Sequence, residues 1–259
     1  MSEQNKDLEV LWEKQGKIRI MTLNRPSKKN ALSLEGQELQ SRYLVEFAND
    51  DEAWVMIITG AGGTFSTGLD LSQASSAIGR QNRPPGLTGH NPVSTWKPVI
   101  AAIAGYALGG GLELALACDI RIATEDARLG FPEVKRSLIA GAGGCQRLAR
   151  LAPLGSAFWM LFTGDWIDAK EAYRIGIVDR VVPNESLLQE ALDLALRICN
   201  NGPLAVRAVK EAVYRGLDLP LYAALVQDNL IAFRNRQTDD AKEGPAAFLE
   251  RRTPNFKGR

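Results

Sequence analysis

Histidine and cysteine are scarce in this chain of 259 residues. The single histidine, His90, excludes a metal site built from several histidines and any hydrolase triad that does not use that residue. The three cysteines, Cys118, Cys145 and Cys199, are too few and too unevenly spaced for a disulfide framework, which favours a reducing compartment. We interpret all four residues as structural or incidental. An enzyme of this composition has to obtain its acid–base chemistry from carboxylates.

An excess of charge of one sign and long hydrophobic runs are also missing. The chain has 31 Lys and Arg against 30 Asp and Glu, a net charge of +1, so the broad basic surface typical of nucleic-acid-binding proteins is excluded. No apolar run reaches the roughly 18 to 20 residues that span a bilayer, and the polar start, MSEQNKDLE, resembles no targeting signal. We expect a cytoplasmic protein with no nucleic-acid partner and no membrane association.

Short apolar runs are present, and they indicate an α/β protein. Residues 54–59 and 99–103 are continuous apolar runs of the kind found in strands covered on both faces, and 120–122 forms a third, shorter run. Each is followed by glycines or a polar turn and then by helix-like sequence. This order predicts ββα or βα units around a mostly parallel sheet. Another helix is expected after Ser33, which suits an N-cap.

The character of the chain changes from about residue 185. Four amphipathic helices are predicted, at 187–198, 203–214, 221–233 and 239–251. We therefore expect two parts, a core of residues 1–200 and a C-terminal helical region of residues 201–259. Within the core, 72–95 is rich in glycine and proline and has few large apolar side chains, so it is expected to form a long mobile loop of the kind that serves as a lid or binding loop.

The glycine-rich segments are the first candidates for chemistry. The segment 59–70 follows a predicted strand, but Phe65 occupies a position where a dinucleotide-binding motif needs glycine, and no Gly-Lys-Ser/Thr of a P-loop occurs. Three glycines at 109–111 precede a short apolar helix, where free backbone N–H groups favour negative charge. Such glycines can also serve only close helix–strand packing.

Two glutamates accompany these segments. Glu113 lies one helical turn after Gly110, so a carboxylate and a helix-start N–H share one face. Its neighbours are leucines, and an acidic residue in apolar surroundings is costly unless it has a use. Glu133 follows Pro132 in a predicted first turn, where it can be catalytic or can simply complement the helix dipole.

The ordered set of motifs resembles the crotonase superfamily, also called the enoyl-CoA hydratase/isomerase family. The resemblance covers nearly the whole chain and includes Asn24-Arg25-Pro26, Phe65-Ser66-Thr67-Gly68-Leu69-Asp70 and Phe131-Pro132-Glu133. The other matching segments are 30–32, 98–102, 105–113, 141–144, 161–164, 243–248 and 256–258. The resemblance implies an α/β fold made of a spiral of ββα units, with the acyl-CoA site in residues 1–200 and a C-terminal helical region that forms a trimer or a dimer of trimers.

The resemblance also implies a reaction, the reversible syn addition of water to a trans-2-enoyl-CoA thioester, which places the chain in fatty acid metabolism. The N–H groups of Leu69 and Gly110 would form an oxyanion hole for an enolate. Glu113 would activate the water that attacks C3, and Glu133 would deliver a proton to C2. No metal and no separate cofactor are expected, because coenzyme A is part of the substrate. Contacts with that substrate are implied for Lys29, Ala31, Thr67, Gly68, Asp70, Leu71, Tyr106, Gly109, Phe248 and Lys257.

Departures from the family pattern leave alternatives open. Arg136 and Ala140 stand where relatives commonly carry leucine-like and proline residues, so the acyl group is not defined. A carnitinyl-CoA dehydratase and a Δ3,Δ2-enoyl-CoA isomerase are the alternative activities, and a non-catalytic CoA-binding or RNA-binding member is an alternative of another class. Asp70 is also expected to cap a short helix. Phe248 and Lys257 match positions that approach CoA from a neighbouring subunit in relatives.

Overall fold

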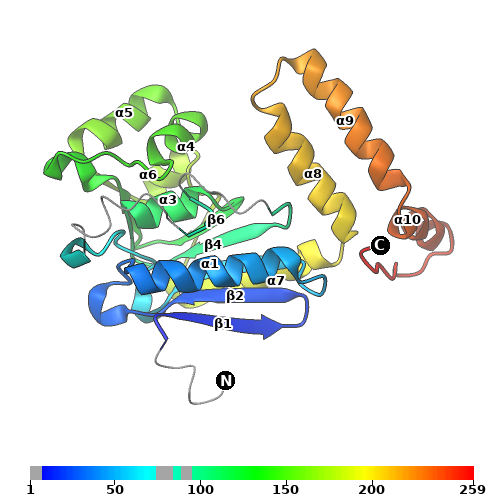
Figure 1. The fold of residues 1–259 in the computed structure, drawn as a ribbon, viewed down its shortest axis with the longest axis horizontal. Helices are drawn as coiled ribbons and strands as arrows, with labels where there is room; N and C mark the ends of the chain where they lie inside the picture. Colours follow the sequence, from blue (N-terminus) through cyan, green and yellow to red (C-terminus); the bar gives the residue numbers. More distant parts are fainter. Residues whose placement is uncertain (1–7, 74–83, 89–94) are drawn as a thin grey trace.

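A computed structural model describes residues 8–73, 84–88 and 95–259. Much of the predicted loop 72–95, with His90, lies outside the described residues. A six-stranded sheet has the order β1-β2-β3-β4-β6-β9 (Figure 1). Only the β1–β2 pair is antiparallel, and the other neighbours are parallel, as the apolar runs predicted. The strands are β1 (Val10–Gln15), β2 (Ile18–Leu23), β3 (Val55–Gly60), β4 (Val99–Ile103), β6 (Ile120–Thr124) and β9 (Arg180–Val182).

A second, three-stranded sheet consists of β5 (Tyr106–Leu108), β7 (Arg128–Gly130) and β8 (Trp166–Asp168). The chain passes from β4 in the large sheet to β5 in the small one and then into helix α3 (Gly110–Leu116). It repeats the step from β6 to β7, which is followed by the 3₁₀ helix η5 (Pro132–Arg136). This alternation between two sheets is the expected spiral of ββα turns.

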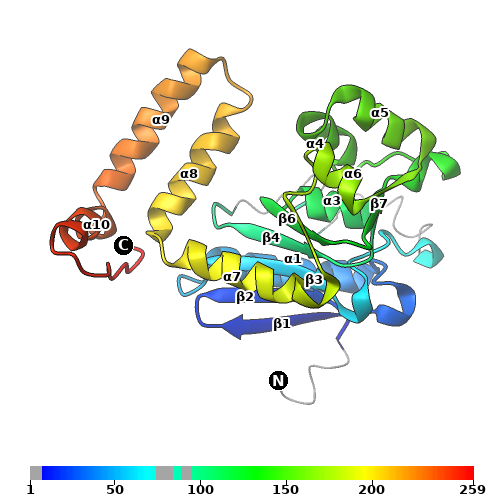
Figure 2. The ribbon, with the colours of Figure 1, turned by 180° about the vertical axis from the view of Figure 1, so that it is seen from behind.

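The large sheet is buried on both faces, as the continuous apolar run at 54–59 predicted. Met56 and Ile58 of β3 belong to one core cluster together with Phe47 of α1 (Leu34–Asn49). Val55 and Ile57 belong to a second cluster with Ala191 and Ala195 of α7 (Leu187–Cys199). Successive residues of a strand point to opposite faces, so α1 and α7 cover opposite sides of the sheet (Figures 1 and 2).

The remaining helices lie above the small sheet and beyond the large one. Above the small sheet are α4 (Gly144–Leu151), α5 (Leu154–Thr163) and α6 (Ala169–Arg174). The C-terminal helices are α8 (Pro203–Gly216), α9 (Leu221–Arg236) and α10 (Asp239–Leu249), close to their predicted bounds. They project away from the sheets (Figure 1). The division of the chain at residue 200 stays a prediction. No helix in the described part of the chain is long and apolar enough to cross a bilayer.

Polar contacts hold α8 against the start of β4. Lys210 donates to the Lys97 carbonyl at 2.9 Å and to Asp119 Oδ2 at 2.7 Å, and the Tyr214 hydroxyl donates to the other Asp119 oxygen at 3.1 Å. Asp119 in turn accepts the Val99 N–H at 2.8 Å. One carboxylate therefore joins the projecting helices to the first residue of a central strand.

Candidate active site

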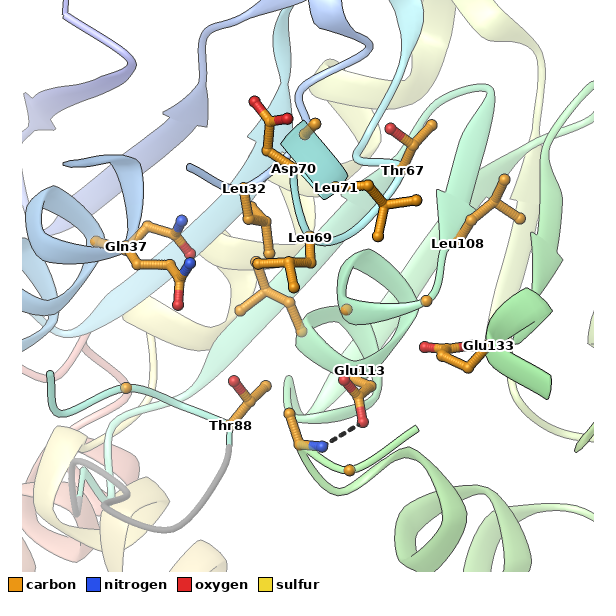
Figure 3. A pocket seen from close by; sticks show the side chains of 18 of the residues that line it. Leu32, Gln37, Thr67, Leu69, Asp70, Leu71, Thr88, Leu108, Glu113 and Glu133 are labelled. Atoms are coloured by element: carbon orange, nitrogen blue, oxygen red, sulfur yellow. Dashed lines mark hydrogen bonds between the residues drawn. The ribbon is translucent and has the colours of Figure 1, made fainter. Parts of the chain in front are cut away.

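A cavity of about 770 Å³ opens between α1, the loop after β3, the start of α3 and η5 (Figure 3). Gly110, Leu69, Glu113 and Glu133 all line it. Residues up to 64 positions apart in the sequence therefore meet in one space. Figure 3 shows Glu113 between Leu69 and Glu133.

Two backbone N–H groups meet at this cavity. A Cβ added to Gly68 would lie 2.8 Å from the Gly110 nitrogen, and one added to Gly110 would lie 3.6 Å from the Leu69 nitrogen. Neither nitrogen donates a backbone hydrogen bond to another described residue. Gly68 has φ +86°, which a residue with a side chain rarely adopts, and its carbonyl accepts the Leu32 N–H at 2.7 Å. This arrangement can hold an anionic oxygen by two donors.

Glu113 is buried, with only 4% of its surface exposed. Its Oε1 accepts the Ala142 N–H at 2.7 Å and the Gly144 N–H at 2.9 Å (Figure 3). The segment 141–144 entered the sequence argument only as a family motif, and the structure gives it a function. The two N–H groups fix the carboxylate orientation and compensate for its burial.

Glu133 has a different environment. Its Oε2 is buried and has no hydrogen-bond partner in the part of the chain that the structure describes. Burial, reinforced by the negative charge of Glu113, raises the pKa of Glu133 to about 7, although its own backbone N–H and Arg136 act in the opposite direction. A carboxyl group with this pKa carries a proton for an appreciable fraction of the time near neutral pH, so it can act as an acid there.

Five of the ten predicted substrate-contact residues line the cavity: Ala31, Thr67, Asp70, Leu71 and Gly109. Asp70 also has the predicted capping role, since its Oδ1 accepts the Ser72 N–H at 3.1 Å at the start of η4 (Leu71–Gln73). Its Oδ2 pairs with Arg25 at 3.0 Å. The contacts with Ser72 and Arg25 lower the pKa of Asp70, so it is held as a carboxylate by the protein itself.

Three further predicted residues flank the wall without lining it. Gly68 shapes the loop that carries the Leu69 N–H. Lys29 places its Nζ 4.8 Å from the centre of the Tyr106 ring, and that ring packs edge-on against Trp166, which lines the cavity. Lys29 and Tyr106 therefore form a cation–aromatic pair at the rim.

The structure does not bring Phe248 and Lys257 to the cavity within one chain. Phe248 lies on α10 and is 82% exposed, and Lys257 follows α10 and is also exposed. Both lie on the side of the molecule where the C-terminal helices project (Figure 1). Their predicted contact with CoA requires a neighbouring subunit.

Several cavity residues were not singled out from the sequence. Trp166 lies in a strand of three residues, too short to recognise by pattern, and Gln37, Gln40 and Ser41 lie on α1. The signal for the α1 residues is their common face, at spacings of three and four. Arg136, noticed only as a departure from the family pattern, also lines the cavity. Among the described residues, no three His, Cys, Asp or Glu side chains cluster as metal ligands would.

Comparison with known proteins agrees with this architecture. Residues 13–259 match the family model described as enoyl-CoA hydratase/isomerase. The chain belongs to the enoyl-CoA hydratase/isomerase family. It is 39% identical to the short-chain-enoyl-CoA hydratase of Clostridium acetobutylicum, over 96% of this chain and 98% of the relative. It is 40% identical to the crotonyl-CoA hydratase of Syntrophomonas wolfei, over 95% and 97%.

Solved structures of enoyl-CoA hydratase/isomerase family members have the same fold. The crystal structure of an enoyl-CoA hydratase from Mycobacterium tuberculosis superposes with a TM-score of 0.91 at 36% identity, covering 98% of this chain and all of the other. That of EchA1 from Mycobacterium marinum gives the same TM-score at 38% identity, with 98% and 100% covered. The resemblance seen in the sequence motifs, and the fold that it implied, are confirmed.

Proposed function

We propose that this protein is an enoyl-CoA hydratase, which adds water reversibly to trans-2-enoyl-CoA thioesters and produces 3-hydroxyacyl-CoA. The observation that carries the proposal is the combination of two carboxyl groups of different character in one cavity, beside two N–H groups that donate to no other described residue. Glu113 is a fixed, hydrogen-bonded carboxylate, and Glu133 has a pKa of about 7. The family relatives named as hydratases support the same conclusion.

In the hydration direction, Glu113 accepts a proton from a water molecule while the resulting hydroxide attacks C3. Electrons of the C2–C3 double bond move toward the thioester, and the negative charge on its oxygen is stabilised by the N–H groups of Leu69 and Gly110. Glu133 then supplies the proton that C2 takes up. Each acid–base group contributes about 10²–10⁴ to the rate. The carboxyl groups exchange protonation states, and proton exchange between them or with solvent water restores both groups before the next turnover.

The second carboxyl group favours hydration over isomerisation. Moving a double bond from C3 to C2 requires one group that removes a proton and returns it at another carbon. Adding water requires one group that deprotonates the water and one that protonates carbon, and the cavity supplies both. Dehydration of carnitinyl-CoA would use the same groups, so substrate assays separate that alternative.

We propose that the protein forms a homo-oligomer, a trimer or a dimer of trimers, through its C-terminal helices. Apolar side chains along α9 are exposed to solvent in the single chain, although they are of the kind usually buried. They are Leu221, Tyr222, Leu225, Val226, Leu230 and Phe233. Covering them with other copies would also explain how Phe248 and Lys257 could approach the CoA of a neighbour. A light-scattering mass of 28.2 kDa, that of one subunit, would contradict this proposal.

We further propose a cytoplasmic location and a place in fatty acid metabolism, with no resident cofactor and no metal. The three cysteines are free thiols, which fits a reducing compartment. The nucleotide portion of coenzyme A enters the site as part of the acyl-CoA substrate, so no separate nucleotide cofactor is needed. The arrangement of proton donors and acceptors described above accounts for the whole reaction without an additional group.

The loss of the conjugated double bond of crotonyl-CoA, followed by ultraviolet absorbance, tests the proposed activity. Wild-type protein should hydrate crotonyl-CoA, and Glu113→Gln and Glu133→Gln should each lose most of the turnover. Glu185→Gln, at an exposed position in the 3₁₀ helix Asn184–Ser186, is the matched control and should retain it. Absence of hydration by the wild type, or unchanged turnover in both cavity variants, would contradict the proposal.

A further inference from the structure

A row of polar side chains on α1 faces the cavity. Gln37, Gln40, Ser41 and Leu44 are spaced by three and four residues, so they share one helix face, and all four line the cavity. We call the first three the polar stripe. A wall that contacts only an alkyl chain needs no hydrogen-bonding groups, yet three of the four positions carry them.

Several polar atoms of the polar stripe have no hydrogen-bond partner among the described residues. Gln40 is 8% exposed, and its Nε2 is buried without a hydrogen-bond partner among the described residues. Ser41 is 7% exposed, and its hydroxyl bonds to no other described residue. Gln37 donates its Nε2 to the Ser33 carbonyl at 3.1 Å, which leaves its Oε1 available. Buried amide and hydroxyl groups in native proteins normally have partners, so these atoms are available to a hydrogen-bonding group of a substrate.

The polar stripe lies on the side of the cavity that fits the acyl group. Its burial deepens along α1, from the half-exposed Gln37 to Leu44, which is 1% exposed. The CoA arm must lead outward, because it ends in a bulky anionic nucleotide, so the inner end is left to the acyl chain. Figure 3 shows Gln37 across the cavity from Glu133, with Leu69 and Glu113 between them.

We propose that the acyl chain of the preferred substrate carries an uncharged oxygen function, a hydroxyl or keto group beyond C3, which the polar stripe binds. This inference rests on the proposed hydratase function and defines its substrate class. The amide and hydroxyl groups supply both donors and acceptors, and rotation about the last Gln torsion is soft enough to orient them. No Lys, Arg or His belongs to the stripe: Arg42, the one basic residue of α1, is exposed, and the basic residues that line the cavity, Lys28 and Arg136, lie on other elements. A carboxylate beside the stripe would therefore be buried without an adjacent counter-charge.

Matched trans-2-enoyl-CoA thioesters of equal chain length test the inference. One set is unsubstituted, a second has a hydroxyl or keto group at C5 or C6, and a third ends in a carboxylate. Wild-type kcat/KM should be at least about tenfold higher for the hydroxyl or keto set than for the unsubstituted set. Gln40→Leu should lower kcat/KM for the hydroxyl or keto set more than for the unsubstituted set, so that the ratio of the two values falls toward one. Ser41→Ala, a smaller change, should reduce the preference in the same direction.

Gln189→Leu is the control for Gln40→Leu, because Gln189 lies on α7 and only pairs with Asp193. It should leave the ratio of the two kcat/KM values unchanged. Equal wild-type activity on both sets, or a preference for the carboxylate set, would overturn the inference. An equal loss on all thioesters in both stripe variants would also overturn it, because that result indicates a structural role or a contact with the CoA arm. If crotonyl-CoA is hydrated in these cases, the proposed function stands; if wild type hydrates no thioester, both proposals fail.

Discussion

Replacing Gly110 by proline would remove one donor of the proposed oxyanion hole while keeping the backbone in place. Gly110 is the first residue of α3, the helical position at which proline is best tolerated. A proline clashes with the residue before it when that residue is in the α conformation, through its Cβ and its backbone. The preceding residue here, Gly109, has no Cβ, and its φ of +53° and ψ of −127° lie outside the α region. A Cβ at position 110 would meet no atom closer than 3.6 Å. The substitution therefore acts mainly at the nitrogen.

The expected loss follows from the chemistry of the enolate. Removing one preorganised donor from an oxyanion hole lowers kcat by about 10²–10³, or about 2.7–4 kcal/mol in the activation free energy. The Leu69 N–H remains, so residual turnover should be measurable. Because the interaction strengthens as charge develops on the oxygen, kcat and kcat/KM should fall together, with KM little changed.

Gly110→Ala is the matched control, since it adds the Cβ and keeps the N–H. Both variants are assayed by steady-state hydration of crotonyl-CoA, with thermal unfolding and CoA binding measured in parallel. Alanine should retain most of the turnover, and proline should lose it while still binding CoA. Turnover of the proline variant within tenfold of wild type, or an equal loss in both variants, would refute the assignment of this N–H to the oxyanion hole.

Three further predictions follow from the geometry of the site and of its supports. First, kcat/KM should fall above about pH 7 for both hydration and dehydration, because the two glutamates must together hold one proton and Glu133 loses its proton near pH 7. The overall equilibrium consumes no proton, so kcat/KM must have the same pH dependence in both directions. A hydration kcat/KM that does not change from pH 6 to 9 would contradict this prediction. Second, Gly109→Ala should lower both turnover and melting temperature, in contrast to Gly110→Ala. The added Cβ would lie 3.0 Å from Glu133 Oε1, and the backbone conformation at this position costs about 1–3 kcal/mol for a residue other than glycine. A variant indistinguishable from wild type would contradict this prediction and show that the loop relaxes freely. Third, Lys210→Met should lower the free energy of unfolding by about 1–3 kcal/mol, because it leaves Asp119 without its cation. The measurement is urea unfolding at fixed protein concentration. Lys242→Met, at an exposed ion pair 3.9 Å apart, should change the free energy of unfolding by less than about 1 kcal/mol.

Local patterns in the sequence predicted the elements that depend on local chemistry. The apolar run at 54–59 predicted a strand covered on both faces. The structure confirms this prediction, since the residues of the run divide between two core clusters. Ser33 caps α1 as expected, its Oγ accepting the Gly36 N–H at 2.9 Å. The three-residue strands β5, β7 and β8 were not recognised, since segments so short show no periodicity.

The candidate site, like the fold, could be predicted only in part from local patterns in the sequence. Spacing alone placed Gly110 and Glu113 on one helix face, and Pro132 placed Glu133 in a first turn with two possible roles. The family motifs added Leu69 and implied the catalytic role of Glu133. The partners of Glu113 could not be derived from the sequence, because Ala142 and Gly144 reach it across 29 and 31 residues. The contribution of α1 to the cavity depends on how that helix packs on the sheet, which no local pattern specifies. The positions of Phe248 and Lys257 depend on copies of the chain beyond the single subunit.

In the proposed mechanism, main-chain N–H groups stabilise the enolate and side chains transfer the protons. This separation has a consequence for how such a site could acquire other reactions. The proposed oxyanion donors are amide groups of Leu69 and Gly110, and nearly any residue supplies an amide group. Proton transfer instead depends on two side chains, and the segment from Glu133 to Gly144 contains one of them and the clamp that holds the other. Exchanging this twelve-residue stretch would alter both proton-transfer groups together and leave the enolate support untouched. A scaffold arranged in this way can acquire a new reaction at a thioester α-carbon by replacing a single loop.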